Sequence, residues 1–258
     1  MRNTRAIAKL LILTHSLVSA SLPPCSAGPL VIPEGTTDIP SEAYKGCTSF
    51  TDSLTIPDGV TSIGDNAFYG CSGFTGSLTI PDSVTSIGDG AFRVCLSPWN
   101  CYGFTGSLTI PNGITSIGHG AFQNCKSLTG SLTIPDGVAF IGDYAFTNCA
   151  GFTGSLTIPA SITYVGPQAF AYLNGLTGSL TIPAGITFDS IGNGAFKNTP
   201  FTSLTAASWG GLESPGDCTR FTSLTIPDGV TFISDRAFYG CSGFTGSLRN
   251  STNCGAFL

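Results

Sequence analysis

Serine and threonine side chains recur at fixed positions in this chain and form its most regular chemical feature. Each Ser-Leu-Thr-Ile-Pro segment places two hydroxyls two residues apart, which puts both on one face of a strand. Strands stacked about 4.7–4.9 Å apart would arrange these hydroxyls as a regular array that could bind a partner. The predicted binding face consists of Ser77, Thr79, Ser107, Thr109, Ser131, Thr133, Ser155, Thr157, Ser179 and Thr181. The alternative is that threonine simply favours strands and the surface is only soluble.

Three aromatic residues lie in segments that depart from this pattern. Trp99 and Tyr102 lie in or beside the insertion "LSPWNCY", and Trp209 lies in "AASWGGLESPGDCTR". Exposed aromatic side chains on loops are frequent anchors of recognition. We therefore expect these three residues to supplement the hydroxyls.

Histidine and carboxylate side chains form no catalytic arrangement. His119 stands alone outside the N-terminal segment, and no Gly-x-Ser-x-Gly motif accompanies it. One aspartate recurs directly after the Ile-Pro step, where proline and aspartate favour a turn. Its copies are Asp58, Asp82, Asp136 and Asp228, and Asn112 and Ala160 replace it elsewhere. We predict no catalytic residue, no metal site and no cofactor, and hence no enzyme.

Six of the ten cysteines share one position, three residues after an aromatic side chain. They are Cys47, Cys71, Cys95, Cys125, Cys149 and Cys241. Because Leu173 and Thr199 occupy the same position, we expect mostly buried thiols that pack as small apolar groups. Disulfides are expected to involve cysteines outside this column, and several pairings remain open. The candidates are Cys25 with Cys47, Cys95 or Cys125 with Cys101, and Cys218 or Cys254 with Cys241.

The elements that position these side chains form an internal repeat. Ile-Pro begins at Ile32, Ile56, Ile80, Ile110, Ile134, Ile158, Ile182 and Ile226, at intervals of 24, 24, 30, 24, 24, 24 and 44 residues. One unit approximates F-T-G-S-L-T-I-P-D-G-V-T-S-I-G-D-x-A-F-x-x-C. A unit this short cannot bury its own apolar face, so successive units must stack into one core.

Within a unit, alternation predicts which side chains point inward. Leu78 and Ile80 are expected in the core, between the outward Ser77 and Thr79. Proline then ends the strand, and Val84 and Ile87 give a second inward pair. The segment 89–92 should form one helical turn that Asp89 caps.

Composition and charge exclude some partners. Arg2, Arg5 and Lys9 precede a short apolar segment and the small residues Val18-Ser19-Ala20, a pattern typical of a secretion signal. Its removal takes three positive charges and shifts the formal net charge from −5 to −8. Such an acidic chain cannot offer the basic surface that nucleic acid requires. No later segment is long and apolar enough to span a membrane.

The repeat unit resembles the BspA-like leucine-rich repeats, whose L-x-I-P, V-x-x-I-G and A-F-x-x-C steps recur about every 23 residues. The match covers residues 30–200 and 221–248. The resemblance implies a repeat solenoid, with parallel strands on the concave face and short helical turns or irregular segments on the convex side. It also implies a non-catalytic protein of the cell surface or the extracellular space that binds or adheres to a protein or glycan.

The expected organisation follows the repeat. It comprises a secretion signal (1–20), an N-terminal edge with a degenerate first repeat (21–46), the array (47–200, with an insertion near 96–102), a loop insertion (201–220) and final incomplete repeats (221–258). Asn250 lies in an Asn-Ser-Thr glycosylation sequence, and the uncapped C-terminal coil could associate end to end with another chain.

Two other functions remain open at this stage. The hydroxyl array could serve a structural or ice-binding role, although the curvature of a leucine-rich repeat works against a flat surface. A hydrolase on a parallel β-helix would need clustered carboxylates on a strand face, where this sequence has hydroxyls.

Overall fold

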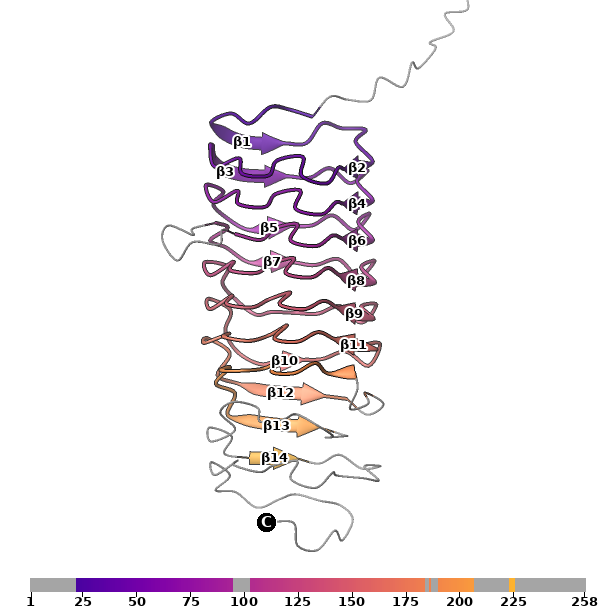
Figure 1. Ribbon diagram of the computed structural model, residues 1–258, viewed down its shortest axis with the longest axis vertical. Coiled ribbons are helices and arrows are strands. Elements are labelled where there is room, and N and C mark those ends of the chain that lie inside the picture. Colours follow the sequence, from indigo (N-terminus) through magenta and orange to yellow (C-terminus); the bar gives the residue numbers. More distant parts are fainter. Residues whose placement is uncertain (1–21, 95–102, 184–185, 187–189, 207–222, 226–258) are drawn as a thin grey trace, which may run out of the picture.

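The chain winds into a column of stacked coils, which confirms the predicted repeat solenoid (Figure 1). The structure is a computed structural model that describes residues 22–94, 103–183, 186, 190–206 and 223–225. The predicted secretion signal and most of the two insertions lie outside these residues. The strands are all paired in parallel, and no α-helix occurs in the described part of the chain.

The Ser-Leu-Thr-Ile segments stack on one side of the column, which we call the Leu-Thr stack. Its strands are β1 (Gly28–Val31), β3 (Phe50–Thr55), β5 (Leu78–Thr79), β7 (Leu108–Thr109), β10 (Leu156–Thr157), β12 (Ser179–Ile182), β13 (Ser203–Ala206) and β14 (Ser223–Thr225). Equivalent residues lie side by side, as in the pairing of Leu156 with Leu180 and of Thr157 with Thr181. Backbone hydrogen bonds between neighbouring strands divide the Leu-Thr stack into three separate sheets, β1–β3, β5–β7 and β10–β12–β13–β14.

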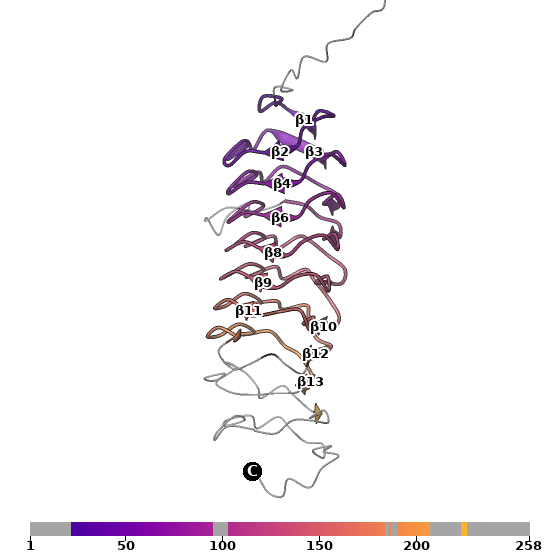
Figure 2. The ribbon, with the colours of Figure 1, turned by 90° about the vertical axis from the view of Figure 1, so that its right-hand side faces the viewer.

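A second set of strands forms a continuous sheet of six on another side of each coil, which we call the Ser-Ile sheet (Figures 1 and 2). It contains β2 (Asp38–Ile39), β4 (Ser62–Ile63), β6 (Ser86–Ile87), β8 (Ser116–Ile117), β9 (Phe140–Ile141) and β11 (Tyr164–Val165). The sequence predicted an inward pair at this position but no strand. Each strand is only two residues long, which is too short for alternation to be visible.

The inward side chains of both stacks form one core, as the alternation predicts. Leu78, Ile80, Val84 and Ile87 are all at most 2% exposed. The turn between the two stacks begins at the proline, where the Val84 N–H donates to the Pro81 carbonyl at 3.0 Å. Proline thus ends one strand and starts the turn that leads to the next.

The Ala-Phe segments make tight turns rather than helices. In one turn the Ala91 N–H donates to the Gly88 carbonyl at 3.3 Å, and the Arg93 N–H donates to the Gly90 carbonyl at 3.0 Å. The prediction that Asp89 caps its own turn is wrong, because its carboxylate accepts from His119 of the next coil. The N–H groups of Ala91 and Arg93 in its own turn already donate to backbone carbonyls.

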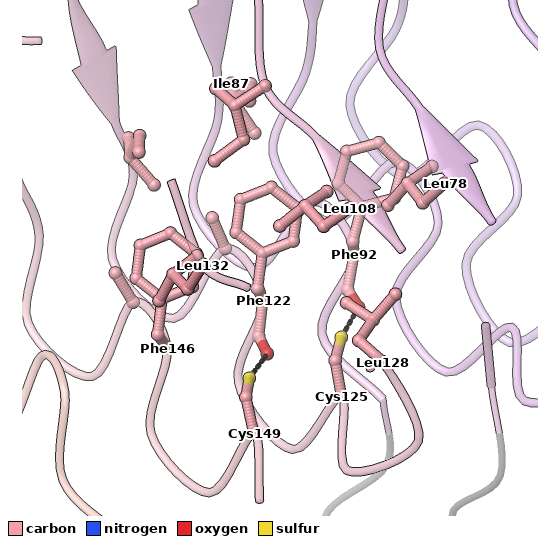
Figure 3. Close-up of a cluster of buried hydrophobic side chains, with 14 of the residues drawn as sticks. Leu78, Ile87, Phe92, Leu108, Phe122, Cys125, Leu128, Leu132, Phe146 and Cys149 are labelled. Carbon is pink, nitrogen blue, oxygen red and sulfur yellow. Dashed lines mark hydrogen bonds between the residues drawn. The ribbon is translucent and has the colours of Figure 1, made fainter. Parts of the chain in front are cut away.

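Aromatic rings run through the core along the column axis. Phe122 stacks on Phe146 with ring centroids 5.2 Å apart, and Phe146 stacks on Phe170 at 5.4 Å. Figure 3 shows Phe92, Phe122 and Phe146 in this arrangement beside inward leucines. Each aromatic pair contributes about 0.5–1.5 kcal/mol beyond the burial of its surface. Because the rings repeat once per coil, the core is continuous across coils.

The predicted loop at 201–220 is wrong for its first six residues. Phe201 is buried, and β13 pairs in register with β12 and β14, so residues 201–206 form part of a coil. The segment Phe-Thr-Ser-Leu-Thr lacks the glycine of the usual unit, and Ala206 replaces the isoleucine of Ile-Pro. A search for Ile-Pro therefore misses this coil. Residues 207–220 lie outside the described part of the chain.

Candidate functional site

The hydroxyls predicted to form a binding face lie on the outside of the Leu-Thr stack. Eight of the ten are exposed, and Ser179 and Thr181 are partly exposed. They alternate with inward side chains such as Leu156, which is fully buried. We call this surface, with its predicted members, the hydroxyl face.

The serines of the hydroxyl face bond to one another between coils. The Ser107 hydroxyl lies 3.3 Å from that of Ser77, and the Ser179 hydroxyl lies 3.1 Å from that of Ser155. The backbone N–H of Ser179 also donates to the Ser155 hydroxyl at 2.9 Å. The serine column therefore helps to fix the spacing of the coils.

The threonines of the same face have no such partners. In the described part of the chain, no hydrogen bond engages the hydroxyls of Thr79, Thr109, Thr133 or Thr157. Each of these hydroxyls can donate one hydrogen bond and accept others. The threonine column is therefore available to a ligand.

Threonines beside the Ser-Ile sheet behave differently. Thr61 donates to the Thr37 carbonyl at 3.1 Å, and Thr163 donates to the Ala139 carbonyl at 2.9 Å. Their hydroxyls are used to join coils. The threonine hydroxyls of the hydroxyl face thus lack the inter-coil bonds that Thr61, Thr85 and Thr163 make.

The hydroxyl face has a groove at the place where the backbone hydrogen bonds between β7 and β10 are interrupted. The segment 131–134 forms no strand and joins neither β7 nor β10. A groove of about 270 Å³ opens between this coil and the next. Its lining consists of Ser131, Leu132, Thr133, Ile134, Asp136, Ser155, Thr157 and Pro159. We call this feature the coil groove.

Sequence reasoning missed two parts of this surface. Ser203 and Thr205 extend the hydroxyl columns, because Thr205 pairs with Thr181 and Thr225. Asp136 was interpreted only as a turn residue, yet it also lines the coil groove. The position of Asp136 could be predicted, because an aspartate recurs directly after Ile-Pro. The groove could not, because the segment 131–134, which lacks backbone hydrogen bonds to its neighbouring coils, has the same sequence as segments that have them.

Aromatic residues stand at two outward positions of the Ser-Ile sheet where other coils have serine. Phe140 pairs with Ser116, and it stacks on Tyr164 with centroids 5.1 Å apart. The Tyr164 hydroxyl donates to Asp143 at 3.2 Å. Burial, followed by the negative charge of Asp143, raises the pKa of Tyr164. These residues were not predicted as a site.

The cysteines fall into two groups in the described part of the chain. Cys25 and Cys47 are joined by a disulfide, one of the pairings that the sequence left open, with their Cα atoms 5.6 Å apart. Cys71, Cys125 and Cys149 are free and buried. Burial raises the pKa of Cys71 to about 12, which keeps the thiol protonated and unreactive.

The buried thiols also donate hydrogen bonds. Cys125 donates to the Phe92 carbonyl at 3.2 Å, and Cys149 donates to the Phe122 carbonyl at 3.0 Å (Figure 3). Thr199 fills the same position and donates to the Phe170 carbonyl at 2.7 Å. In these coils the position therefore holds a small donor, whereas Leu173 fills it with an apolar side chain.

Other predicted site residues lie outside the described part of the chain. They are Trp99, Tyr102, Trp209, Cys95, Cys101, Cys218, Cys241, Cys254 and Asn250. Within the described residues, no group of three or more histidine, cysteine or acidic side chains could hold a metal ion. Asp58, Asp82 and Asp136 occupy turns, as predicted.

A family profile matches nearly the whole chain. The BspA type leucine rich repeat region matches in six copies, over residues 21–102, 99–209 and 216–253. The chain belongs to this family. The resemblance noted in the sequence is thereby confirmed, and the BspA-type repeat is the unit that forms each coil.

Solved structures of other leucine-rich repeat proteins share the fold of this BspA-type chain. A leucine-rich repeat protein of T. pallidum is 27% identical, with a TM-score of 0.54, over 69% of this chain and 84% of the other. A leucine-rich repeat protein from Bacteroides ovatus is 22% identical, with a TM-score of 0.50, over 84% of this chain and 65% of the other. The comparison with curated protein sequences finds no match. These likenesses support a repeat scaffold.

Proposed function

We propose that this chain is a secreted or cell-surface scaffold that binds a protein or glycan through the hydroxyl face. One observation carries the proposal. Four threonine hydroxyls of the hydroxyl face are exposed and without partners, those of Thr79, Thr109, Thr133 and Thr157. By contrast, Thr61 and Thr163 beside the Ser-Ile sheet donate to backbone carbonyls. Free hydroxyls at regular spacing can bind a ligand without breaking bonds that hold the coils together.

Two features support export of the chain. The first twenty residues have the pattern of a secretion signal. The Cys25–Cys47 disulfide is of a kind that persists in oxidising compartments and is rare in the cytosol. In the described residues no helix is long and apolar enough to cross a membrane.

A charge substitution with a matched control tests the binding face. The biotinylated chain is applied to extracellular matrix and to whole cells, and the retained protein is measured. Replacing Thr79, Thr109 and Thr157 together by lysine should reduce retention at least tenfold. Replacing Thr61, Thr85 and Thr115 by lysine adds the same charge to the other side and should leave retention within twofold. Equal retention of the two triple variants would contradict the proposal.

A structural or ice-binding role is the second candidate. The in-register threonines of β10, β12, β13 and β14 favour it, because they form a regular column. The interruption at 131–134 counts against it, because it breaks the array in the middle of the face. An ice-recrystallisation assay on the purified chain decides between the two: inhibition that the triple substitution at Thr79, Thr109 and Thr157 abolishes would favour ice binding.

A further inference from the structure

We propose that the coil groove binds one ring of a neutral sugar chain. The inference rests on the proposed function, since it names the ligand class of the same face. It starts from the interruption of the backbone hydrogen-bond ladder at 131–134, where the groove lies. In the described part of the chain, the backbone groups of residues 131–134 bond to neither neighbouring coil.

Unpaired backbone groups make this segment a place for polar ligands. A buried N–H or C=O without a partner is unfavourable, whereas one that faces an open groove can bond to water. Water that bridges such groups can be displaced by a ligand that reproduces its hydrogen bonds. Sugar hydroxyls are suited to this, because each of them both donates and accepts.

The side chains of the groove match the two kinds of surface on a sugar ring. Ser131, Thr133, Ser155 and Thr157 supply four hydroxyls, and the Asp136 carboxylate supplies a strong acceptor. Leu132, Ile134 and Pro159 add apolar surface to the same lining. A sugar ring presents hydroxyls at its edge and C–H groups on its faces, so both parts of the lining find partners.

The charge of the groove selects neutral sugars. No lysine, arginine or histidine lines it, and its one charged residue is Asp136. Uronic acids and sulfated sugars would place a negative charge near this carboxylate, in a chain of formal net charge −5. Like charges brought together at a binding site oppose association.

The lining also favours a sugar over a protein partner. Protein interfaces depend on tryptophan, tyrosine and arginine anchors, and serine and threonine are under-represented among their hot spots. The groove contains none of those anchors. Its volume of about 270 Å³ lies just below the roughly 300–1,000 Å³ of pockets for drug-sized ligands, which suits a single ring.

The test uses defined oligosaccharides and the full chain. Binding is measured by calorimetry to neutral gluco-, manno- and galacto-hexaoses, and to oligogalacturonate and sulfated galacto-oligosaccharide of the same length. At least one neutral hexaose should bind, and both acidic probes should bind at least tenfold more weakly. Binding of no neutral hexaose, or preference for an acidic one, would overturn the inference.

Paired valine variants place the site. Thr133→Val with Thr157→Val removes two groove hydroxyls without changing side-chain shape, and should weaken binding of the neutral hexaose at least tenfold. Thr61→Val with Thr115→Val is the control, since both residues are exposed beside the Ser-Ile sheet and outside the hydroxyl face, and it should stay within twofold. Asp136→Asn should weaken binding several-fold. If the groove pair binds as well as the control pair, the groove is not the site; thermal melting verifies that each variant is folded.

The outcome can be separated from that of the proposed function. Retention on matrix or cells through the hydroxyl face, without binding of any neutral hexaose, overturns only the sugar inference. Equal retention of the two triple-lysine variants contradicts the proposed function itself, whatever the calorimetry gives.

Discussion

The Asp89 carboxylate accepts a hydrogen bond from the backbone N–H of His119, one coil further along, at 2.7 Å. The same bond recurs at this corner of the column: Asp65 accepts from the Asp89 N–H at 2.9 Å. His119 accepts from the Asp143 N–H through Nδ1 at 2.9 Å. Each side chain therefore fixes the backbone of the coil that follows.

The ladder of side-chain acceptors stops at Pro167, which has no N–H to donate. Asp143, the last acceptor before it, receives the Tyr164 hydroxyl at 3.2 Å instead. The sequence shows aspartate replaced by histidine and proline at this position, and the structure explains why one replacement keeps the ladder and the other ends it. Histidine has a ring nitrogen that can accept, so it preserves the bond.

Asp89→Ala should lower the free energy of unfolding by about 1 kcal/mol, because the His119 N–H loses its acceptor. Asp89→Asn retains an oxygen at the same place and should lose less than half of that. Urea denaturation of the two variants and the parent measures the difference. Equal midpoints for alanine and asparagine would show that the ladder bond does not stabilise the fold.

The cysteine column makes a second prediction. Cys149→Thr keeps a donor for the Phe122 carbonyl, as Thr199 does for Phe170, whereas Cys149→Val has nearly the same shape and no donor. The threonine variant should be more stable than the valine variant by about 1 kcal/mol. Thermal and urea unfolding compare the pair. A valine variant as stable as the threonine variant would mean that the position requires only a small group.

The repeat period and the inward residues could be predicted because one pattern is copied many times. Leu78 and Ile80 alternate with hydroxyls, and the copies in other coils confirm the period. The Ser-Ile sheet could not be predicted, because strands such as β9 have two residues and alternation needs more. Its strands exist because neighbouring coils are present to pair with them, and this is a tertiary effect.

The hydroxyl face could be predicted for the same reason, but the coil groove could not. The segment Ser131-Leu132-Thr133-Ile134 has the same letters as Ser77-Leu78-Thr79-Ile80, which includes a paired strand. The difference arises in how the coils stack. A sequence that repeats its letters gives no sign of where a ladder is broken.

Tyr44 provides a third prediction, because it occupies the position of the core phenylalanines. It stacks on Phe68 at 5.4 Å, but its buried hydroxyl has no hydrogen-bond partner. Tyr44→Phe should raise the free energy of unfolding by about 1 kcal/mol at pH 7, because an unsatisfied buried group is removed. Tyr164→Phe is the control, since it loses the bond to Asp143 and should not gain stability. A loss of stability in Tyr44→Phe would show that the hydroxyl has a favourable contact.

The same residue predicts a dependence on pH. Burial raises the pKa of Tyr44 to about 12, while tyrosine in the unfolded chain ionises near about 10. Between these values the unfolded chain releases a proton that the folded chain keeps, so the parent loses stability as the pH rises. The advantage of Tyr44→Phe should therefore grow by about 1.4 kcal/mol between pH 9 and pH 11. Urea unfolding at both pH values measures it; a constant difference would contradict the burial of the phenol.

Gly142 tests how closely the coils approach. A Cβ at this position would lie 2.5 Å from the His119 nitrogen and 2.7 Å from the Gly118 carbonyl carbon, both of them backbone atoms that cannot turn aside. Gly142→Ala should therefore cost about 1–3 kcal/mol, because two coils must separate. Gly59→Ala is the matched control: its nearest atom is the Thr36 oxygen at 3.4 Å, and the restricted unfolded chain should raise stability by about 0.4–1 kcal/mol. Both substitutions restrict the unfolded chain equally, so the difference between their unfolding free energies reports the contact alone. Equal stability of the two variants would mean that the coils lie further apart at Gly142, and the ladder from Asp89 to Asp143 could not form as described.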